Sequence, residues 1–193
     1  EFWDRLAPGY SKQAISDNES YARKLANTQS YMTPNMHVLE FGCGTGSTAL
    51  THAPHVAHIT ATDVSAAMIN IGCEKARQAD INNVSFQHSG VEEFDAPDGS
   101  FDMVLALNLI HLLPDSTAAL AKIHRLLKPG GIFISSTPCL ADRMWFLRPV
   151  ISVMQWIGKA PFVSFLSTKD LLKATNTAGF AAQDHWTHGQ ANS

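Results

Sequence analysis

The chain has 193 residues, of which 45% are hydrophobic and 16% are charged, as in ordinary folded globular proteins and unlike disordered ones. The 14 Lys and Arg residues against 17 Asp and Glu residues give a formal charge of −3, and no basic stripe favours nucleic acid as a partner. This length suits one domain with a sizeable core, so we expect residues 1–193 to form a single domain.

Cysteine usage and the start of the sequence indicate a compartment. Cys43, Cys73 and Cys139 are an odd number at spacings typical of neither a zinc site nor a disulfide framework. No signal peptide opens the sequence, so we expect a cytoplasmic protein. The histidines at 52, 55 and 58 share no helical face because Pro54 interrupts them, and no metal site is predicted.

From Val38 onward, apolar runs typical of strands alternate with stretches typical of helices. The expected strands are Val38–Phe41, His58–Thr62, Val84–His88, Met103–Leu107, Ile132–Thr137 and Gly179–His185. The expected helices between them are Ser47–Ala53, Ala66–Ala79, Thr117–Leu127 and Lys169–Ala178. This alternation predicts parallel strands joined by right-handed helical crossovers, hence a doubly wound α/β sheet. A helix over Asn18–Tyr31 precedes it, so residues 1–36 are expected to form a helical cap on a core of residues 37–137.

Three glycines at every second position predict a tight turn after the first strand. In Val38–Ala49, VLEFGCGTGSTA, they are Gly42, Gly44 and Gly46. Such glycines let the backbone turn sharply and approach a ligand, while the next helix points its amide groups at that ligand. Dinucleotide-binding turns share these features, but the position of their third glycine is Ser47 here.

Two acidic residues near this turn narrow the choice of ligand. Glu40 precedes Gly42 by two positions, where a carboxylate is a poor host for a pyrophosphate and a good one for a cationic ligand. Asp63 follows the turn by about 20 positions, where it suits the two hydroxyls of a ribose; capping the next helix is its alternative role. A ribose that carries cationic groups and no phosphate describes S-adenosylmethionine.

Five sequence blocks occur in the order and spacing of a known family. They are VLEFGCGTG, ATDVS, FDAPDGSFDMV, LNLIHLLPD and LKPGGIFISSTP. In these blocks the chain resembles the class I S-adenosylmethionine-dependent methyltransferases, of the group similar to the ubiquinone/menaquinone-biosynthesis (type 11) methyltransferases. The resemblance implies a mostly parallel, Rossmann-like sheet of the seven-stranded type. It also implies S-adenosyl-L-methionine as cofactor, S-adenosyl-L-homocysteine as product, and methyl transfer to a small molecule.

The same resemblance implies which residues hold the cofactor. The glycine turn lies under its methionine and ribose parts, and residues after the second, third and fourth strands border the rest. The early segment FWDRLAPGYS resembles one whose tyrosine closes over the cofactor; an ordinary half-buried aromatic is the alternative for that tyrosine. The implied cofactor-binding residues are Tyr10, Glu40, Gly42, Cys43, Gly44, Gly46, Asp63, Val64, Met68, Ser89, Gly90, Val91, Leu107 and Asn108.

The sequence departs from the family in two places. Family members commonly carry an aspartate after the third strand, which accepts a hydrogen bond from the adenine amino group; Gly90 stands there instead. The family's sheet also ends in an antiparallel hairpin of strands six and seven. This sequence ends soon after the sixth, so we expect the last strand to be missing and the sixth to be exposed.

The acceptor side of the site is less determined. His111, in LNLIHLLPD, is the candidate general base for a hydroxyl or an acidic carbon, near the carboxyl end of the fourth strand. A structural histidine that ties down the loop before Pro114 is the alternative. The cofactor activates the methyl group itself, so the chain is left to align the acceptor and exclude water.

An apolar segment over residues 140–168 interrupts the strand–helix alternation. Pro149 is placed to open a short helix there, with Arg148, Ser152, Gln155 and Lys159 on one narrow stripe. The charged residues and prolines inside this segment argue against a membrane-spanning helix. The apolar side of this helix has two alternative roles. It packs on the domain's own core or on a partner subunit such as a second copy, or it forms a lid over an apolar substrate or a contact with the membrane surface. The substrate-side candidates are Trp145, Phe146, Trp156, Phe162 and Phe165.

We therefore expect an S-adenosylmethionine-dependent methyltransferase that acts on a small, apolar or aromatic molecule. A nicotinamide-dependent oxidoreductase is the alternative enzyme, against which the glycine spacing and the position of Glu40 argue. A methyltransferase-like module that binds the nucleoside without turnover is the alternative outside catalysis, since fold does not decide function.

Overall fold

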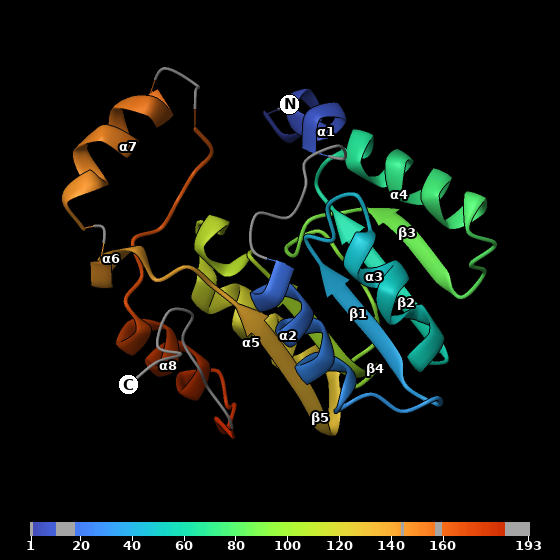
Figure 1. Cartoon of the computed structure of the whole chain (residues 1–193). Coiled ribbons are helices and arrows are strands. Elements are labelled where there is room, and N and C mark those ends of the chain that lie inside the picture. The colour runs from blue at the N-terminus through green and yellow to red at the C-terminus, as the bar shows by residue number, and fades with distance from the viewer. Residues whose placement is uncertain (1, 11–17, 144, 157–159, 184–193) are drawn as a thin grey trace.

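The computed structural model describes residues 2–10, 18–143, 145–156 and 160–183 of the chain (Figure 1). The strands are β1 His37–Phe41, β2 His58–Asp63, β3 Val84–His88, β4 Phe101–Leu107 and β5 Leu127–Ser136. The α-helices are α1 Phe2–Tyr10, α2 Asn18–Gln29, α3 Ser47–His52, α4 Ala66–Gln78, α5 Ser116–Leu126, α6 Leu140–Arg143, α7 Arg148–Trp156 and α8 Thr168–Thr177. Short 3₁₀ turns lie at η1 Ala53–His55, η2 Ile110–Leu112 and η3 Trp145–Leu147.

The strands form one five-stranded parallel sheet in the order β3-β2-β1-β4-β5. The chain builds the sheet outward from β1 through β2 to β3, and then crosses to the other side of β1 to form β4 and β5. The connections that follow β1 and β4 therefore lead to opposite faces of the sheet, which makes a topological switch point between these two neighbouring strands. Ligands of open α/β sheets bind in the crevice at such a point. The predicted doubly wound α/β fold is confirmed, and the functional site is expected at this edge.

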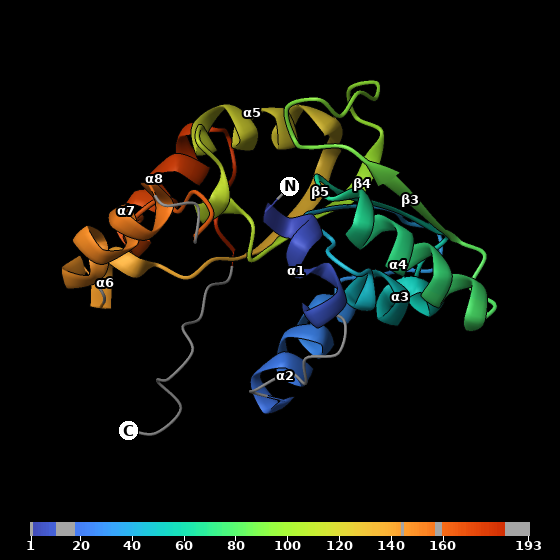
Figure 2. The ribbon, with the colours of Figure 1, turned by 90° about the horizontal axis from the view of Figure 1, so that it is seen from above.

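Alternating side chains of the central strands build one hydrophobic core on each face of the sheet. Leu39 and Phe41 of β1 join the core beneath α5, whereas Val38 joins the core that contains Ala49 of α3 and Ile69 of α4. The period of two follows from the pleat, which sends successive side chains to opposite faces. Figure 2 shows the result as α2, α3 and α4 on one side of the sheet and α5 and α8 on the other.

Side-chain caps begin the helices near the positions that the sequence indicates. The Ser65 hydroxyl accepts from the Met68 amide at 3.2 Å, and Asp115 accepts from the Ala118 amide at 2.9 Å. Each cap satisfies an amide that has no partner inside the helix. The strand and helix boundaries through α5 therefore fall within one or two residues of the predicted ones.

The last two predicted strands differ from the structure. The strand predicted over Ile132–Thr137 begins at Leu127, because Lys128–Gly131 bulges out of β5 while Phe101 still pairs with Leu127. The sixth strand predicted over Gly179–His185 is wrong for its described part, which runs to Gln183 without strand structure. Phe180 instead packs on Phe133, 5.0 Å between ring centroids, so its apolar character reflects burial beside α8.

A long insertion between β5 and α8 is closed at its base by hydrogen bonds. The Ala141 amide donates to the Leu166 carbonyl at 3.2 Å, and the Thr168 amide and hydroxyl donate to Asp142 at 2.9 and 2.6 Å. The insertion carries α6, η3 and α7, and α7 stands away from the sheet (Figure 1). Pro149 lies in the first turn of α7, as the sequence predicts; the side chain of Ser152 and all of Lys159 lie outside the described part.

Candidate functional site

The glycine turn between β1 and α3 is held in a left-handed backbone conformation. Gly42, Gly44 and Gly46 have φ angles of 67°, 54° and 74°, which residues with a Cβ rarely adopt. A Cβ on Gly46 would stand 2.5 Å from Cε1 of Phe86. The packing of β3 against the turn therefore requires glycine at this position, whether or not a ligand also approaches it.

Asp63, at the end of β2, ties the turn to the start of α4. One carboxylate oxygen accepts from the Gly44 amide at 2.9 Å, and the other accepts from the Ser65 amide at 2.9 Å. Ser65, and not Asp63, is the side chain that caps α4. Each carboxylate oxygen has a second lone pair, so Asp63 can still accept from two hydroxyl groups. The geometry therefore shows a tethering role for Asp63 and leaves acceptor capacity for the ribose that the sequence predicts.

Glu40 is a second carboxylate beneath the same turn. It is 2% exposed, and its Oε2 has no hydrogen-bond partner among the described residues. Burial, and then the nearby negative charge of Asp63, raise the pKa of Glu40 to about 8. Burial also raises the pKa of Asp63 above its ordinary value, against the opposing effect of its two amide donors. Two carboxyl groups destabilised by burial suit a ligand that brings positive charge and hydroxyl donors.

Cys43 lies inside the turn as a small buried residue. Its amide donates to the Thr62 carbonyl at 2.9 Å, which continues the β1–β2 pairing into the turn. Burial and the carboxylates of Glu40 and Asp63 hold the pKa of the Cys43 thiol well above its ordinary value. The thiol is therefore protonated at neutral pH, which excludes it as a thiolate nucleophile.

The predicted adenine side of the site lies where β2 and β3 end together. The Ser89 amide donates to the Asp63 carbonyl at 3.0 Å, and Val64, directly after Asp63, is 56% exposed. Gly90 leaves the place of the family's aspartate without a side chain. The nearest carboxylate is that of Glu93, whose Oε2 is 3.5 Å from the Gly90 amide nitrogen.

Two further residues predicted to border the adenine are buried. Val91 is 5% exposed and belongs to the core beneath α5. Met68 is 2% exposed, within the first turn of α4. Each therefore supports this end of the sheet and presents little surface to a ligand.

The end of β4 meets the glycine turn from the other side of the switch point. A Cβ on Gly42 would lie 3.0 Å from Cδ1 of Leu109, so the loop after β4 touches the turn directly. Leu107 ends β4, and Asn108 has a φ of 57° with its amide bonded to the Ser136 carbonyl at 2.6 Å. This strained position points the backbone after β4 along the edge where the cofactor is expected.

His111 lies in η2, beside the insertion. Its carbonyl accepts from the Ser164 amide at 2.6 Å, and its Nδ1 is buried without a partner among the described residues. Burial lowers the pKa of His111, so the imidazole is neutral at pH 7 and able to take a proton. Both predicted roles, general base and structural tie, are compatible with this position.

The N-terminal helix α1 contributes a residue that sequence reasoning missed. Oδ1 of Asp4 accepts from the Ser65 hydroxyl at 2.7 Å and from the Ala67 amide at 3.2 Å. Asp4 thereby joins α1 to the start of α4, next to Asp63. No spacing pattern links positions 61 residues apart, so only the fold reveals this contact. Tyr10 ends α1, but its side chain lies outside the described part of the structure.

The substrate-side candidates are not brought to the turn. Trp145, Phe146 and Trp156 are 70%, 58% and 87% exposed, on η3 and α7. Phe162 is 50% exposed, whereas Phe165 is partly buried under Arg148, whose guanidinium carbon is 5.9 Å from its ring centroid. The interpretation that this segment packs on the domain's own core is therefore wrong for the four exposed side chains, but not for Phe165.

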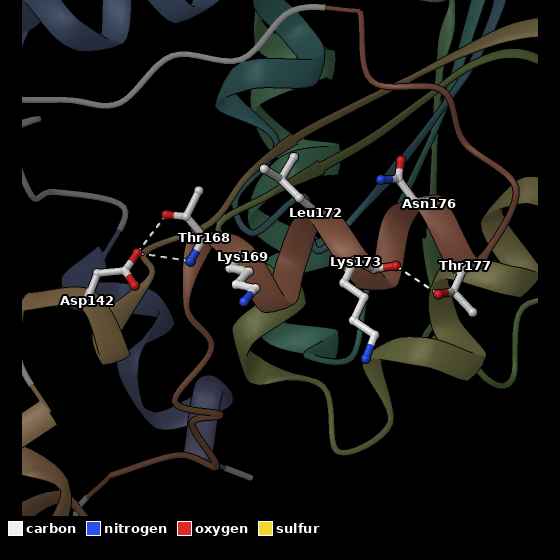
Figure 3. A pocket seen from close by; sticks show the side chains of 7 residues that line it. All are labelled: Asp142, Thr168, Lys169, Leu172, Lys173, Asn176 and Thr177. Atoms are coloured by element: carbon white, nitrogen blue, oxygen red, sulfur yellow. Dashed lines mark hydrogen bonds between the residues drawn. The ribbon is translucent and has the colours of Figure 1, made fainter.

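A wide open hollow of about 830 Å³ lies along the outer side of α8 (Figure 3). Its lining residues are Asp142, Thr168, Lys169, Leu172, Lys173, Asn176 and Thr177. None of the predicted cofactor residues belongs to this set. The hollow is a surface feature at the base of the insertion and is separate from the glycine turn.

The residues at the turn fit S-adenosylmethionine. The unpartnered oxygen of buried Glu40 and the free lone pairs of Asp63 match a cationic group and a ribose diol. The described residues contain no cluster of three His, Cys, Asp or Glu side chains that could hold a metal ion. None of their helices is long and apolar enough to cross a bilayer.

Comparison with known proteins agrees with a methyltransferase domain. Residues 38–131 match a methyltransferase domain family. A demethylmenaquinone methyltransferase of Listeria welshimeri is 29% identical over 135 residues, covering 67% of this chain and 57% of the relative. The chain thus spans little more than half the length of this curated relative.

Two solved structures share the fold. The YcgJ protein of Bacillus subtilis has a TM-score of 0.75 at 22% identity, covering 84% of this chain and 70% of its own. The [4+2]-cyclase SpnF has a TM-score of 0.69 at 24% identity, covering 86% of this chain and 60% of its own. At such identities these likenesses concern the fold alone. The match of residues 38–131 makes this part of the chain similar to a methyltransferase domain, and the fold and the glycine turn agree with S-adenosyl-L-methionine as the cofactor.

Proposed function

We propose that the chain transfers a methyl group from S-adenosylmethionine to a small apolar or aromatic acceptor. The observation that carries this proposal is the pair of buried carboxyl groups, Glu40 and Asp63, on the two strands beside the glycine turn. Without a cationic ligand both are costly to ionise, as the raised pKa of each indicates. A ligand that brings a positive charge and a ribose offsets that cost.

Each part of the chain has a distinct task in this proposal. Asp63 binds the ribose hydroxyls, and the two backbone amides that donate to its carboxylate keep Asp63 in position. Glu40 faces the cationic end of the ligand. Bound S-adenosylmethionine supplies a methyl group already activated by its sulfonium, so the protein needs no nucleophile of its own. Its contribution is to align the acceptor and exclude water, which is worth roughly 7–11 kcal/mol at best.

A hydroquinone-like ring is the acceptor class that we favour. The name of the Listeria relative, a demethylmenaquinone methyltransferase, supports an apolar ring compound. The aromatic and aliphatic side chains of η3 and α7 suit such a compound as well. A hydroxyl or an acidic ring carbon loses a proton during methylation, and neutral His111 is the candidate to receive it.

Two other functions compete with this one. SpnF shares the fold and is named as a cyclase, so a class I fold does not by itself entail methyl transfer. A binding module without turnover would keep Glu40 and Asp63 but would have no need of His111. A nicotinamide-dependent oxidoreductase is disfavoured because Glu40 would face a pyrophosphate.

A transfer assay tests the proposal. The chain is incubated with S-adenosylmethionine labelled in its methyl group and a panel of hydroquinones, phenols and aliphatic amines. We expect label in a hydroquinone or phenol, and loss of that transfer in Asp63→Ala. Cofactor binding with no transfer to any acceptor class would favour the binding module, and transfer only to amines would overturn the acceptor assignment.

A further inference from the structure

A short turn after β3 brings a carboxylate back toward Gly90. The Phe94 amide donates to the Gly90 carbonyl at 3.0 Å, which closes a single turn of helical type over residues 90–94. Side chains three positions apart lie on the same side of such a turn. Oε2 of Glu93 accordingly lies 3.5 Å from the Gly90 amide nitrogen, and Glu93 is exposed to solvent. The turn therefore presents a carboxylate at the carboxyl end of β3.

Buried side chains on either side of Glu93 anchor this turn. Val91 and Phe94 are 5% and 3% exposed, and both belong to the core beneath α5. Lys122 of α5 donates to the Glu92 carbonyl at 2.7 Å. The backbone that carries Glu93 is thus attached to the core and to α5, so its position is set before any ligand arrives.

An exposed apolar side chain lies on the other side of Gly90. Val64 directly follows Asp63 and is 56% exposed, and Nε2 of His88 donates to its carbonyl at 2.9 Å. A Cβ on Gly90 would lie 3.2 Å from Cγ1 of Val64 and 3.9 Å from Oε2 of Glu93. The apolar side chain and the carboxylate thus flank one point at the ends of β2 and β3.

This pair of side chains fits one face and one edge of adenine. Under the proposed function the ribose lies at Asp63, so the base lies beside Val64, the next residue. A purine is apolar on its faces, whereas the 6-amino group of adenine is a hydrogen-bond donor at its edge. A carboxylate can accept about four hydrogen bonds, and the Gly90 amide uses one of those of Glu93. Glu93 therefore keeps acceptor capacity for an amino group.

We propose that Glu93 accepts a hydrogen bond from the 6-amino group of adenine, in place of the aspartate that the resemblance implies at position 90. The inference rests on the proposed function, because it takes the ligand to be an adenosyl compound. Gly90 has no side chain to fill the space between Val64 and Glu93, so the base can approach both. A carboxylate at this edge selects a 6-amino purine over a 6-oxo purine, whose 6-oxygen has no proton to donate.

Calorimetric titration with S-adenosylhomocysteine and S-inosylhomocysteine, which differ in the 6-amino and 6-oxo groups, tests the proposal. We expect the wild type to bind the adenosyl compound at least about tenfold more tightly. The side-chain amide of Glu93→Gln can donate to a 6-oxo group, so this variant should bind the inosyl compound more tightly than the wild type does, and the preference should shrink. Glu92→Gln is the matched control, because it removes the same charge from the adjacent exposed position and should keep the wild-type preference.

The contrary results separate this inference from the proposed function. A preference that is unchanged in Glu93→Gln would overturn the inference, as would an equal loss of preference in Glu92→Gln or a wild type that binds both compounds equally. Each of these results leaves the proposed function intact, since S-adenosylhomocysteine is still bound. Binding of neither compound by the wild type would contradict the proposed function and this inference with it.

Discussion

The carboxylate of Asp63 accepts a hydrogen bond from the amide of Gly44 at 2.9 Å, and this contact joins the second strand to the middle of the glycine turn. It makes the conformation of the turn depend on an ionised group that is itself mostly buried. Under the proposed function, ligand binding and loop conformation are coupled through this single side chain.

Replacing Asp63 with Asn tests this coupling. The amide side chain keeps one acceptor oxygen but turns an NH₂ group toward a backbone amide donor, so one of the two hydrogen bonds is lost. Since a hydrogen bond to a charged group is worth about 1.5–3 kcal/mol, we expect affinity for S-adenosylhomocysteine to fall at least about tenfold. Calorimetric titration measures this, and an unchanged affinity would place the ribose elsewhere.

Glu40→Gln is expected to change how stability depends on pH. The pKa of Glu40 is raised from 4.5 to about 8 in the folded chain, so between these pH values the unfolded carboxyl loses its proton while the folded one keeps it. Stability from this group is full below pH 4.5, falls as pH rises toward 8, and levels off above it. The variant lacks this loss, on the order of a few kcal/mol.

Urea unfolding of both proteins at a series of pH values measures that difference. We expect Glu40→Gln to gain stability relative to the wild type steadily between pH 5 and pH 8, since Asp63 is common to both. Parallel stability curves for the two proteins across this range would mean that the native pKa of Glu40 is not raised.

Proton release should accompany binding of the cationic cofactor. At pH 7 the Glu40 carboxyl is largely protonated, and a positive charge beside it favours the ionised form. Titrating S-adenosylmethionine at pH 7 in buffers of different ionisation enthalpy gives the number of protons released. We expect release by the wild type and a smaller value in Glu40→Gln; equal values in both proteins would contradict the assignment of Glu40 to the cationic end.

Gly46→Ala should destabilise the fold more than an equivalent change elsewhere. A left-handed conformation costs a non-glycine residue roughly 1–2 kcal/mol, and the contact with Phe86 adds an overpacking cost of roughly 1–3 kcal/mol. Gly130→Ala is the control, because Gly130 has a φ of 77° and open space around its missing Cβ. Thermal unfolding compares the stability of the two variants. Adding Phe86→Leu should restore part of the stability that Gly46→Ala loses, and none of what Gly130→Ala loses.

His111→Asn separates its two candidate roles once an acceptor is known. As a general base, His111 contributes about 10²–10⁴-fold to the rate, so kcat should fall by that order while S-adenosylhomocysteine affinity is kept. Because burial lowers the pKa of His111, the wild-type rate should fall only below pH 6.5, as the imidazole gains a proton. A lower melting temperature with the acidic limb of the rate profile unchanged would indicate the structural role.

The sequence predicts the first four strands and the glycine turn well because local signals there agree with the fold. Apolar runs of strand length, glycines that need positive φ, and Ser65 as a cap each act over a few residues. The wrong sixth strand has the opposite cause: Phe180 is apolar because it packs on Phe133, and burial beside a helix produces the same local pattern as a strand.

Long-range contacts explain what the sequence leaves out of the site. Asp4 reaches Ser65, 61 positions along the chain, only because α1 packs against α4. Likewise, the composition of α7 is readable from the sequence, but whether Trp156 is covered depends on where the helix lies.

Calorimetric titration of the chain with S-adenosylmethionine, S-adenosylhomocysteine and NADH shows directly which nucleotide the glycine turn binds. We expect binding of both adenosyl compounds, loss of that binding in Asp63→Ala, and no binding of NADH. Tight binding of NADH with neither adenosyl compound bound would contradict this expectation.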